Sequence, residues 1–368
     1  MFISYFFDNG SPCNWDFIDN ELVVELLYDH ELGTTNKAAG HFHFSVSNPE
    51  QQAVRLRIKL TTNIWNGILG SPFETDLPSY YSEDGKNWHG FVWTQEDNGD
   101  LVAAFGNLPF FYLARLEPYT ATNLEQLWGE IKDHPMISKT HIGYTVENRP
   151  LEIFHIGTGD ARVLLRGRAH PWEPGGNWVV EGLIKEFITQ YELDPIKLKH
   201  LAFDIMPMAN KDGVAHGMTR FNLKGADLNR GFSRSREDIK PIAPENIALF
   251  EWLDKQQLAD KLPLLALDFH NDCVGGLLTP VGDEHKMNIL ATELRHHTFA
   301  PETFIASPNT DGFAAGIHTQ YGMSAATLEL NAKYIEQLGQ IPTAAHWQQF
   351  GRSFLEVALK FIRLINDR

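Results

Sequence analysis

Residues 162–173 read Arg-Val-Leu-Leu-Arg-Gly-Arg-Ala-His-Pro-Trp-Glu, and this stretch predicts both a fold and a site. Its first seven residues have the apolar content of a strand, and the Pro174-Gly175-Gly176-Asn177 that follows resembles the start of a helix. His170 and Glu173 therefore lie on a loop that leaves a strand, which is where α/β sheets usually place their sites. A chain with 16 His and 47 acidic residues is expected to contain one His-x-x-Glu pair by chance, so the pair gains meaning only from distant partners.

The first distant partner is His270. Residues 263–269 read Pro-Leu-Leu-Ala-Leu-Asp-Phe, which indicates a buried strand with His270 at its carboxyl end. Two imidazoles and one carboxylate can hold a divalent metal, and this ligand set is established for catalytic zinc, which keeps a fourth position for water. We therefore expect one Zn²⁺ per chain, bound by His170, Glu173 and His270.

Further polar residues follow in order along the chain. They lie in Asn210-Lys211-Asp212-Gly213, at Arg220, in Asp227-Leu228-Asn229-Arg230 and in Thr327-Leu328-Glu329-Leu330. They add a carboxylate and two arginines, which remain for chemistry and for anchoring a substrate. The whole set is typical of a zinc peptidase site.

With these motifs, residues 120 to 350 resemble the zinc metallocarboxypeptidase family. The chain as a whole is most similar to the cytosolic carboxypeptidase branch, which carries a β-sandwich before the catalytic domain. The resemblance implies that Glu329 is the general base and that Arg220 stabilises the oxyanion. It also implies that Asn229 and Arg230 bind the terminal carboxylate of the substrate, and that Asp227 orients His170.

These roles also make chemical sense without the family. A carboxylate beside an activated water can take its proton and pass it to the leaving amine. A forked guanidinium is the best donor for a free carboxylate, and a second one aimed at a developing oxyanion acts in the transition state. The predicted substrate is therefore a peptide or a protein C-terminal tail, and the predicted activity is that of a metallocarboxypeptidase.

Two features of the family have no clear match in this chain. One is the tyrosine that covers the substrate, for which Tyr321 is a candidate. The other is the arginine in the pocket of members that remove glutamate. Residues 311–321 contain no Arg or Lys, so they predict an apolar or small pocket and a preference for neutral terminal residues. Arg234, Arg236 or a protonated His318 could supply a charge instead.

Hydrophobic periodicity divides the chain into two expected domains. Residues 1–117 contain short alternating stretches, such as 53–60 with aliphatic residues on one face and cations on the other, and they predict an all-β sandwich. From residue 118 to 368, strands expected at 151–156, 162–168, 200–206, 263–269 and 325–330 alternate with helical patterns. The second domain is therefore expected to be a mixed sheet flanked by helices, an α/β/α carboxypeptidase-like domain.

Composition limits the partners and the compartment. The net charge of −16 argues against nucleic acid and against anionic membranes, and no apolar run approaches the roughly 18 residues of a membrane helix. The first ten residues lack a basic start and an extended apolar core, so we expect no secretory signal. Cys13 and Cys273 alone make no disulfide framework. The sequence therefore predicts a cytoplasmic protein.

Two other classes of protein fit part of the pattern. Metal-dependent deacylases of the aspartoacylase and desuccinylase type also combine a His-x-x-Glu pair, a distant His and an Asp-x-Asn-Arg segment, but they release an acyl group from a small amino acid. A murein-peptide amidase would be a close variant. Residues 210–213 and the leading sandwich favour the peptidase. The third hypothesis is a non-catalytic binding protein, which the retained candidate ligands and base argue against.

Overall fold

The computed structural model describes residues 1–73, 78–272, 277–299, 303–304 and 309–366, so Cys273 lies outside it. Contacts divide the chain into two compact units. The first unit contains Met1–Thr122 together with two short segments from later in the chain, His170–Trp172 and Asp212–Ala226. The second unit contains the remaining residues. Among the residues described, no helix is both long enough and apolar enough to cross a membrane.

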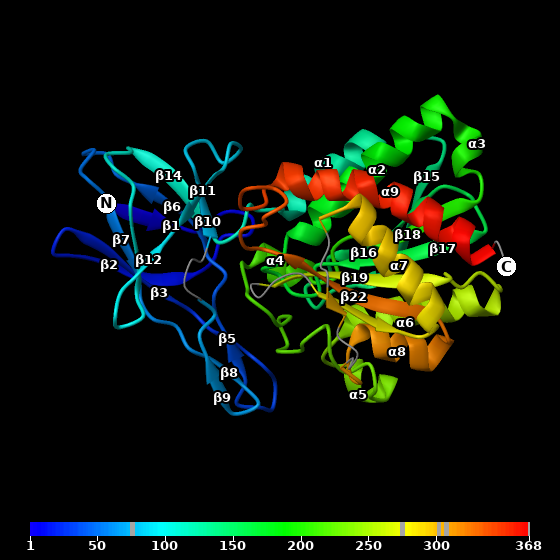
Figure 1. Ribbon diagram of the computed structural model, residues 1–368. Coiled ribbons are helices and arrows are strands. Elements are labelled where there is room, and N and C mark those ends of the chain that lie inside the picture. Colours follow the sequence, from blue (N-terminus) through cyan, green and yellow to red (C-terminus); the bar gives the residue numbers. More distant parts are fainter. Residues whose placement is uncertain (74–77, 273–276, 300–302, 305–308, 367–368) are drawn as a thin grey trace. The chain divides into compact units, whose positions relative to one another are not determined.

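The first unit has two five-stranded sheets and a small four-stranded one (Figure 1). One large sheet has the order β1 (Phe2–Ser4), β6 (His43–Ser47), β14 (Phe110–Ala114), β10 (Pro78–Ser82) and β11 (His89–Val92). The other has the order β12 (Thr94–Gln95), β13 (Leu101–Ala104), β7 (Arg55–Ile58), β3 (Glu21–Leu26) and β2 (Cys13–Ile18). The small sheet has the order β4 (Asp29–His30), β5 (Lys37–Ala38), β8 (Asn63–Trp65) and β9 (Ile68–Gly70).

Alternation along β7 explains how these sheets bury a core. Leu56 and Ile58 are fully buried. Arg55 and Arg57, which alternate with them along the strand, both form ion pairs with Glu21. Apolar side chains thus face one side of the sheet and a charged network covers the other. The all-β character expected for the N-terminal part of the chain is confirmed.

The second unit is built on one eight-stranded mixed sheet. Its strand order is β15 (Ile137–Tyr144), β16 (Pro150–Ile156), β18 (Leu201–Met206), β17 (Ala161–Gly167), β19 (Leu265–Asp272), β22 (Ser324–Asn331), β20 (Leu277–Val281) and β21 (Thr303–Phe304). The four central strands β18, β17, β19 and β22 are parallel, and most of their residues are buried. This is the pattern of a sheet covered on both faces.

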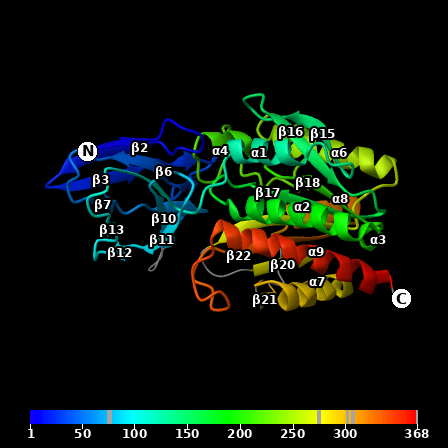
Figure 2. The same ribbon diagram turned by 90° about the horizontal axis from the view of Figure 1, so that it is seen from above.

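Helices cover both faces of this sheet, as Figures 1 and 2 show for α2 and α9 on one face and for α6 and α8 on the other. The helices are α1 (Ala121–Ile131), α2 (Gly175–Leu193), α3 (Pro195–Leu198), α4 (Lys211–Ala215), α5 (Arg236–Ile239), α6 (Pro244–Leu258), α7 (Glu284–His297), α8 (Phe313–Tyr321) and α9 (Ala344–Asn366). The expected α/β/α architecture is confirmed, and the five expected strands correspond to β16, β17, β18, β19 and β22.

The largest difference between an expected and an observed strand boundary is at the end of β19. The strand that carries His270 was expected to end at residue 269, but β19 continues to Asp272. The reason is its partner: β19 stays in parallel register with β22 as far as the pair Asp272 and Asn331. His270 is therefore held inside the sheet and is not part of a loop.

Candidate metal centre and catalytic residues

Three candidate metal ligands come together in the structure. His170, Glu173 and His270 are all buried, and the nearest ligand atoms of the three side chains lie within 4.8 Å of one another. His170 and Glu173 occupy the loop between β17 and α2, whereas His270 lies on β19, next to β17 in the sheet. The parallel sheet thus joins residues that are about a hundred positions apart in the chain.

The backbone reaches His170 through an unusual turn. Arg168 is buried and has φ of +62°, a left-handed conformation that a residue with a Cβ adopts only when its surroundings hold it there. Asn210 helps to stabilise this conformation. Its backbone N–H donates to the Arg168 carbonyl (3.0 Å), and its side-chain amide donates to the Ala169 carbonyl (3.4 Å). The Arg168 guanidinium also donates to Asn177 Oδ1 on α2 (3.1 Å). The Asn210-x-Asp-Gly motif therefore fixes the loop that carries the first two candidate ligands.

His270 lies between two carboxylates. Its Nδ1 is 2.8 Å from Glu173 Oε2, and its Nε2 is 2.9 Å from Asp268 Oδ2. Burial by itself lowers the pKa of His270, but the negative charges of Asp268, Glu173 and Glu329 outweigh it and raise this pKa well above its ordinary value. Two buried carboxylates and one half-buried carboxylate around a single imidazole stabilise a cation at this place. A divalent metal ion bound by two imidazoles and Glu173 meets that electrostatic demand, so the residues fit a zinc ion.

Asp268 is a residue that the sequence analysis missed. It accepts a hydrogen bond at the ring nitrogen of His270 that points away from Glu173, which is the place of an orienting carboxylate behind a metal-bound histidine. Asp268 precedes His270 by two positions on one strand, so both side chains lie on the same face of the sheet. That spacing was visible in the sequence and could have revealed it.

Behind Asp268 lies Arg166, whose side chain is fully buried. The two residues are register partners on β17 and β19, and Arg166 Nη1 is 3.1 Å from Asp268 Oδ2. The second terminal nitrogen of Arg166 donates to the Leu228 carbonyl (2.7 Å) and to Asn246 Oδ1 on α6 (3.2 Å). One guanidinium therefore joins the candidate ligand His270, through Asp268, to the segment expected to bind the substrate carboxylate.

Glu329, the candidate base, lies on β22 directly across from His270 in the parallel ladder. Its side chain is half-buried, whereas the neighbouring Leu328 and Leu330 are buried. The register of two strands thus sets the candidate base beside a candidate ligand.

Residues 227–230 form a tight turn made by their own hydrogen bonds. Asp227 Oδ1 accepts from the Asn229 backbone N–H (2.8 Å), and the Asp227 carbonyl accepts from the Arg230 backbone N–H (3.0 Å). Asn229 Oδ1 accepts from the backbone N–H of Phe313, the first residue of α8 (3.0 Å). Because its oxygen is used in this way, Asn229 offers its amide nitrogen as the donor for a carboxylate. The orientation of His170 by Asp227 stays a prediction.

Tyr321 lies at the end of α8 in a polar cluster with α5 and α6. Its hydroxyl is 2.9 Å from Arg236 Nη2 and 2.9 Å from Asp254 Oδ1, and Arg236 also forms an ion pair with Asp254. Burial and Asp254 raise the pKa of Tyr321 above its ordinary value. The hydroxyl of Tyr321 and the charge of Arg236 are therefore engaged with each other and with α6. Of the other two candidate charges, Arg234 is exposed and His318 Nδ1 contacts the Met323 carbonyl (2.9 Å).

Arg220 belongs to the first unit, in the segment that follows α4. Its guanidinium lies over the ring of Trp65, with 4.4 Å from Cζ to the ring centroid. Asp29 receives the backbone N–H groups on both sides of Arg220 and that of Arg220 itself. These two contacts were not expected from the sequence.

Comparison with known proteins agrees with this geometry. Residues 124–271 match the model of the zinc carboxypeptidase family. Mouse (Mus musculus) cytosolic carboxypeptidase 6 is 30% identical over 130 residues, which cover 33% of this chain and 24% of that protein. Cytosolic carboxypeptidase 3 of Bos taurus is 32% identical over 246 residues, which cover 56% of this chain and 23% of that protein. The chain thus spans about a quarter of the length of these relatives.

Solved structures extend the likeness to the whole chain. The crystal structure of a metallo-carboxypeptidase from Burkholderia cenocepacia has a TM-score of 0.84 at 20% identity and covers 99% of both chains. A metallo-carboxypeptidase from Pseudomonas aeruginosa has a TM-score of 0.79 at 18% identity and covers 100% of this chain and 99% of the other. The fold is therefore that of the metallo-carboxypeptidases. The resemblance predicted from the motifs is confirmed for residues 124–271, which match the zinc carboxypeptidase family.

Proposed function

We propose that the protein is a zinc metallocarboxypeptidase, which hydrolyses the C-terminal peptide bond of peptides or protein tails. The observation that supports this best is the buried cluster of His170, Glu173 and His270, with Glu329 across the ladder from His270. A structural cluster of two histidines would not need a further carboxylate on the adjacent strand. A hydrolase needs one, because a water proton must be taken up and delivered again.

The proposed mechanism divides the work among five residues. When bound, a zinc ion supplies a water whose pKa is about 7 and polarises the scissile carbonyl. Glu329 takes a proton from the attacking water as the C–O bond forms, and it delivers this proton to the amide nitrogen as the C–N bond breaks. Arg220 donates hydrogen bonds to the oxyanion. Asn229 and Arg230 bind the terminal carboxylate of the substrate, while Asp227 orients His170.

We further propose that the enzyme prefers neutral terminal residues. A buried glutamate would require a cation, and Arg236 already forms an ion pair with Asp254. The net charge of −16 would also repel a polyglutamate tail. The contacts of Tyr321 favour a structural role at the end of α8 over closure onto substrate. Release of a terminal Glu faster than Ala, Leu or Phe in a competition assay would contradict this preference.

The proposed domain organisation is a β-sandwich over residues 1–117 and a catalytic domain over residues 118–368. We propose a cytoplasmic location as well, since the curated relatives are cytosolic carboxypeptidases.

The decisive experiment compares peptides with a free and an amidated C-terminus, with and without a metal chelator. We expect cleavage of the free peptide only, loss of that activity with chelator and its return with Zn²⁺. Arg230→Ala should raise KM for the free peptide more than it lowers kcat, because Arg230 binds a carboxylate that is present in ground and transition states alike. Equal cleavage of the amidated peptide would refute the carboxypeptidase assignment, and cleavage of N-acyl amino acids instead would favour a deacylase.

A further inference from the structure

The segment that carries Arg220 is held by residues from the beginning of the chain. Asp29, on β4, accepts backbone hydrogen bonds from Arg220 (2.7 Å), Phe221 (2.8 Å) and Thr219 (3.3 Å). The Thr219 hydroxyl oxygen accepts from the backbone N–H of His41 (3.2 Å). A carboxylate that accepts three successive backbone N–H groups fixes the local backbone, because charge-assisted hydrogen bonds are stronger than neutral ones.

Gly225, in the same segment as Arg220, also contacts the beginning of the chain. The Gly225 carbonyl accepts from the Leu32 backbone N–H (2.8 Å), and Gly225 has φ of +73°. A Cβ at this position would lie 2.7 Å from the His30 carbonyl oxygen and 2.7 Å from the Leu32 nitrogen. The close approach of the two backbones thus requires glycine, and it prevents the segment from shifting relative to β4.

The side chain of Arg220 has a support of its own. Trp65 lies at the end of β8, just before a turn in which Asn66 and Gly67 both have positive φ. The turn is anchored, because the Asn66 backbone N–H donates to Oδ1 of the buried Asn36 (2.7 Å). The Arg220 guanidinium lies over the Trp65 ring, with 4.4 Å from Cζ to the ring centroid. This contact restrains where the guanidinium lies, because a cation is attracted to the face of an aromatic ring.

The N-terminal part of the chain also contacts the loop of the candidate metal ligands. The Thr219 carbonyl accepts from the backbone N–H of Trp172 (3.3 Å), and the Arg115 guanidinium lies 4.2 Å from the Trp172 ring centroid. Trp172 lies between His170 and Glu173 in the sequence. One β-rich region therefore supports two segments that carry candidate site residues.

We propose that Asp29 and Trp65 are positioning residues, which hold the backbone and the guanidinium of Arg220 ready to donate to the oxyanion. This inference rests on the proposed function, and it gives the N-terminal β-rich region a part in the reaction. An arginine that is already stacked has less side-chain freedom to lose when the oxyanion forms, so the gain appears in the transition state. Loss of Trp65 should therefore lower kcat more than it changes KM.

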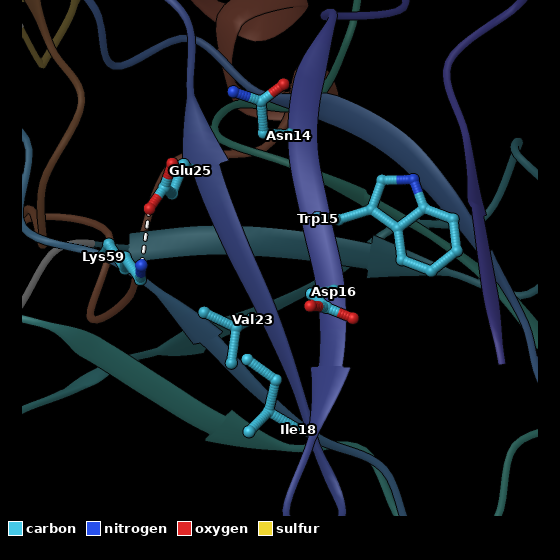
Figure 3. A pocket seen from close by; sticks show the side chains of 7 residues that line it. All are labelled: Asn14, Trp15, Asp16, Ile18, Val23, Glu25 and Lys59. Atoms are coloured by element: carbon cyan, nitrogen blue, oxygen red, sulfur yellow. Dashed lines mark hydrogen bonds and ion pairs between the residues drawn. The ribbon is translucent and has the colours of Figure 1, made fainter.

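The test measures kcat and KM on a free-terminus peptide for the full chain and its variants. We expect Trp65→Leu to lower kcat about tenfold with KM nearly unchanged, and Trp65→Phe to keep most of the activity, because a ring face remains for the guanidinium. Asp29→Asn should lower kcat in the same way. Trp15→Leu is the matched control, since Trp15 is also a half-buried tryptophan on a strand of the first unit, where it lines a hollow with Lys59 (Figure 3).

A double-mutant cycle separates positioning from general destabilisation. In an Arg220→Ala background, Trp65→Leu should cause no further loss of kcat, because the residue through which it acts is absent. Inhibition by a phosphonate peptide, which mimics the tetrahedral intermediate, should weaken in Trp65→Leu by the same factor as kcat. Inhibition by the released amino acid should not change.

Two outcomes would overturn different parts of this reasoning. If Arg220→Ala lowers kcat but Trp65→Leu has no effect, or the same effect in both backgrounds, the positioning role is wrong and the proposed function stands. If Arg220→Ala itself leaves kcat unchanged, the oxyanion role of Arg220 in the proposed function fails, and the positioning role fails with it.

Discussion

Replacement of Arg166 by methionine tests the buried charges behind the metal centre. The Arg166 side chain is fully buried and hydrogen bonds to Asp268, the Leu228 carbonyl and Asn246. Asp268 Oδ1 is buried and has no hydrogen-bond partner among the described residues, so the charge of Asp268 depends on Arg166 and His270. Without Arg166, the carboxylate would keep only the imidazole as a partner.

The size of the effect follows from this burial. Removal of one partner from a buried ion pair destabilises a protein by about 3–5 kcal/mol, because the other charge stays buried without compensation. Methionine fills much of the same volume beside the rings of Phe232 and Phe313, so a cavity adds little. At roughly 2–4 °C per kcal/mol for a unit of this size, Arg166→Met should lower the melting temperature of the second unit by about 6–20 °C.

The assay is urea and thermal unfolding of the metal-free protein, so that metal binding does not add to stability. Arg55→Met is the control, since it breaks an exposed ion pair with Glu21 and should cost less than about 1 kcal/mol. The double variant Arg166→Met/Asp268→Asn should regain part of the loss, because an amide has no charge and can still accept from His270. If Arg166→Met costs no more stability than Arg55→Met, or if the double variant is no more stable than the single one, Asp268 does not depend on Arg166 for its charge.

Three further predictions concern the metal, the base and acid stability. His170→Ala should abolish stoichiometric zinc binding, because only two of the three protein ligands remain. Metal analysis of the purified variant that finds full loading would contradict the site. Glu329→Gln should keep zinc and KM but lower kcat by about 10²–10⁴, and single-turnover kinetics would show whether chemistry is the slowed step. Burial raises the pKa of Glu21, but hydrogen bonds from Arg57 and Arg55 outweigh it and hold this pKa below its ordinary value. The stability that this carboxylate contributes is therefore complete above its ordinary pKa and is lost as pH falls through the lowered pKa. Denaturation between pH 7 and pH 3 should show a smaller loss of stability for Glu21→Gln than for the parent.

Local pattern was enough to predict the elements that carry the candidate ligands. Apolar runs of strand length predicted β17 and β19, and the polar residues that follow or end such runs were expected to meet at one edge of a sheet. His170, Glu173 and His270 were found in this way, and the structure brings them together. This worked because the carboxyl ends of neighbouring parallel strands must lie side by side, whatever connects them.

The register between neighbouring strands could not be predicted from the local sequence pattern. Arg166 and Asp268 read as ordinary residues of two apolar strands, and only the pairing of β17 with β19 shows that they face each other. The pairing of β19 with β22 likewise sets Glu329 across from His270. A shift by one residue would turn each side chain to the other face of the sheet, so the register decides which charges meet.

The composition and motifs of the sequence alone determined the class of the fold, the three candidate metal ligands and the candidate base. Only the tertiary structure decided what supports them: Asp268 and Arg166 behind His270, and Asp29 and Trp65 around Arg220. Trp65 and Arg220 are 155 positions apart in the sequence. Hydrophobic periodicity describes one element at a time, so it could not predict that the strand end with Trp65 contacts the later segment with Arg220. Hydrophobic spacing reports which face of one element is buried, whereas the partner of a buried or stacked charge depends on packing between elements that are distant in the chain.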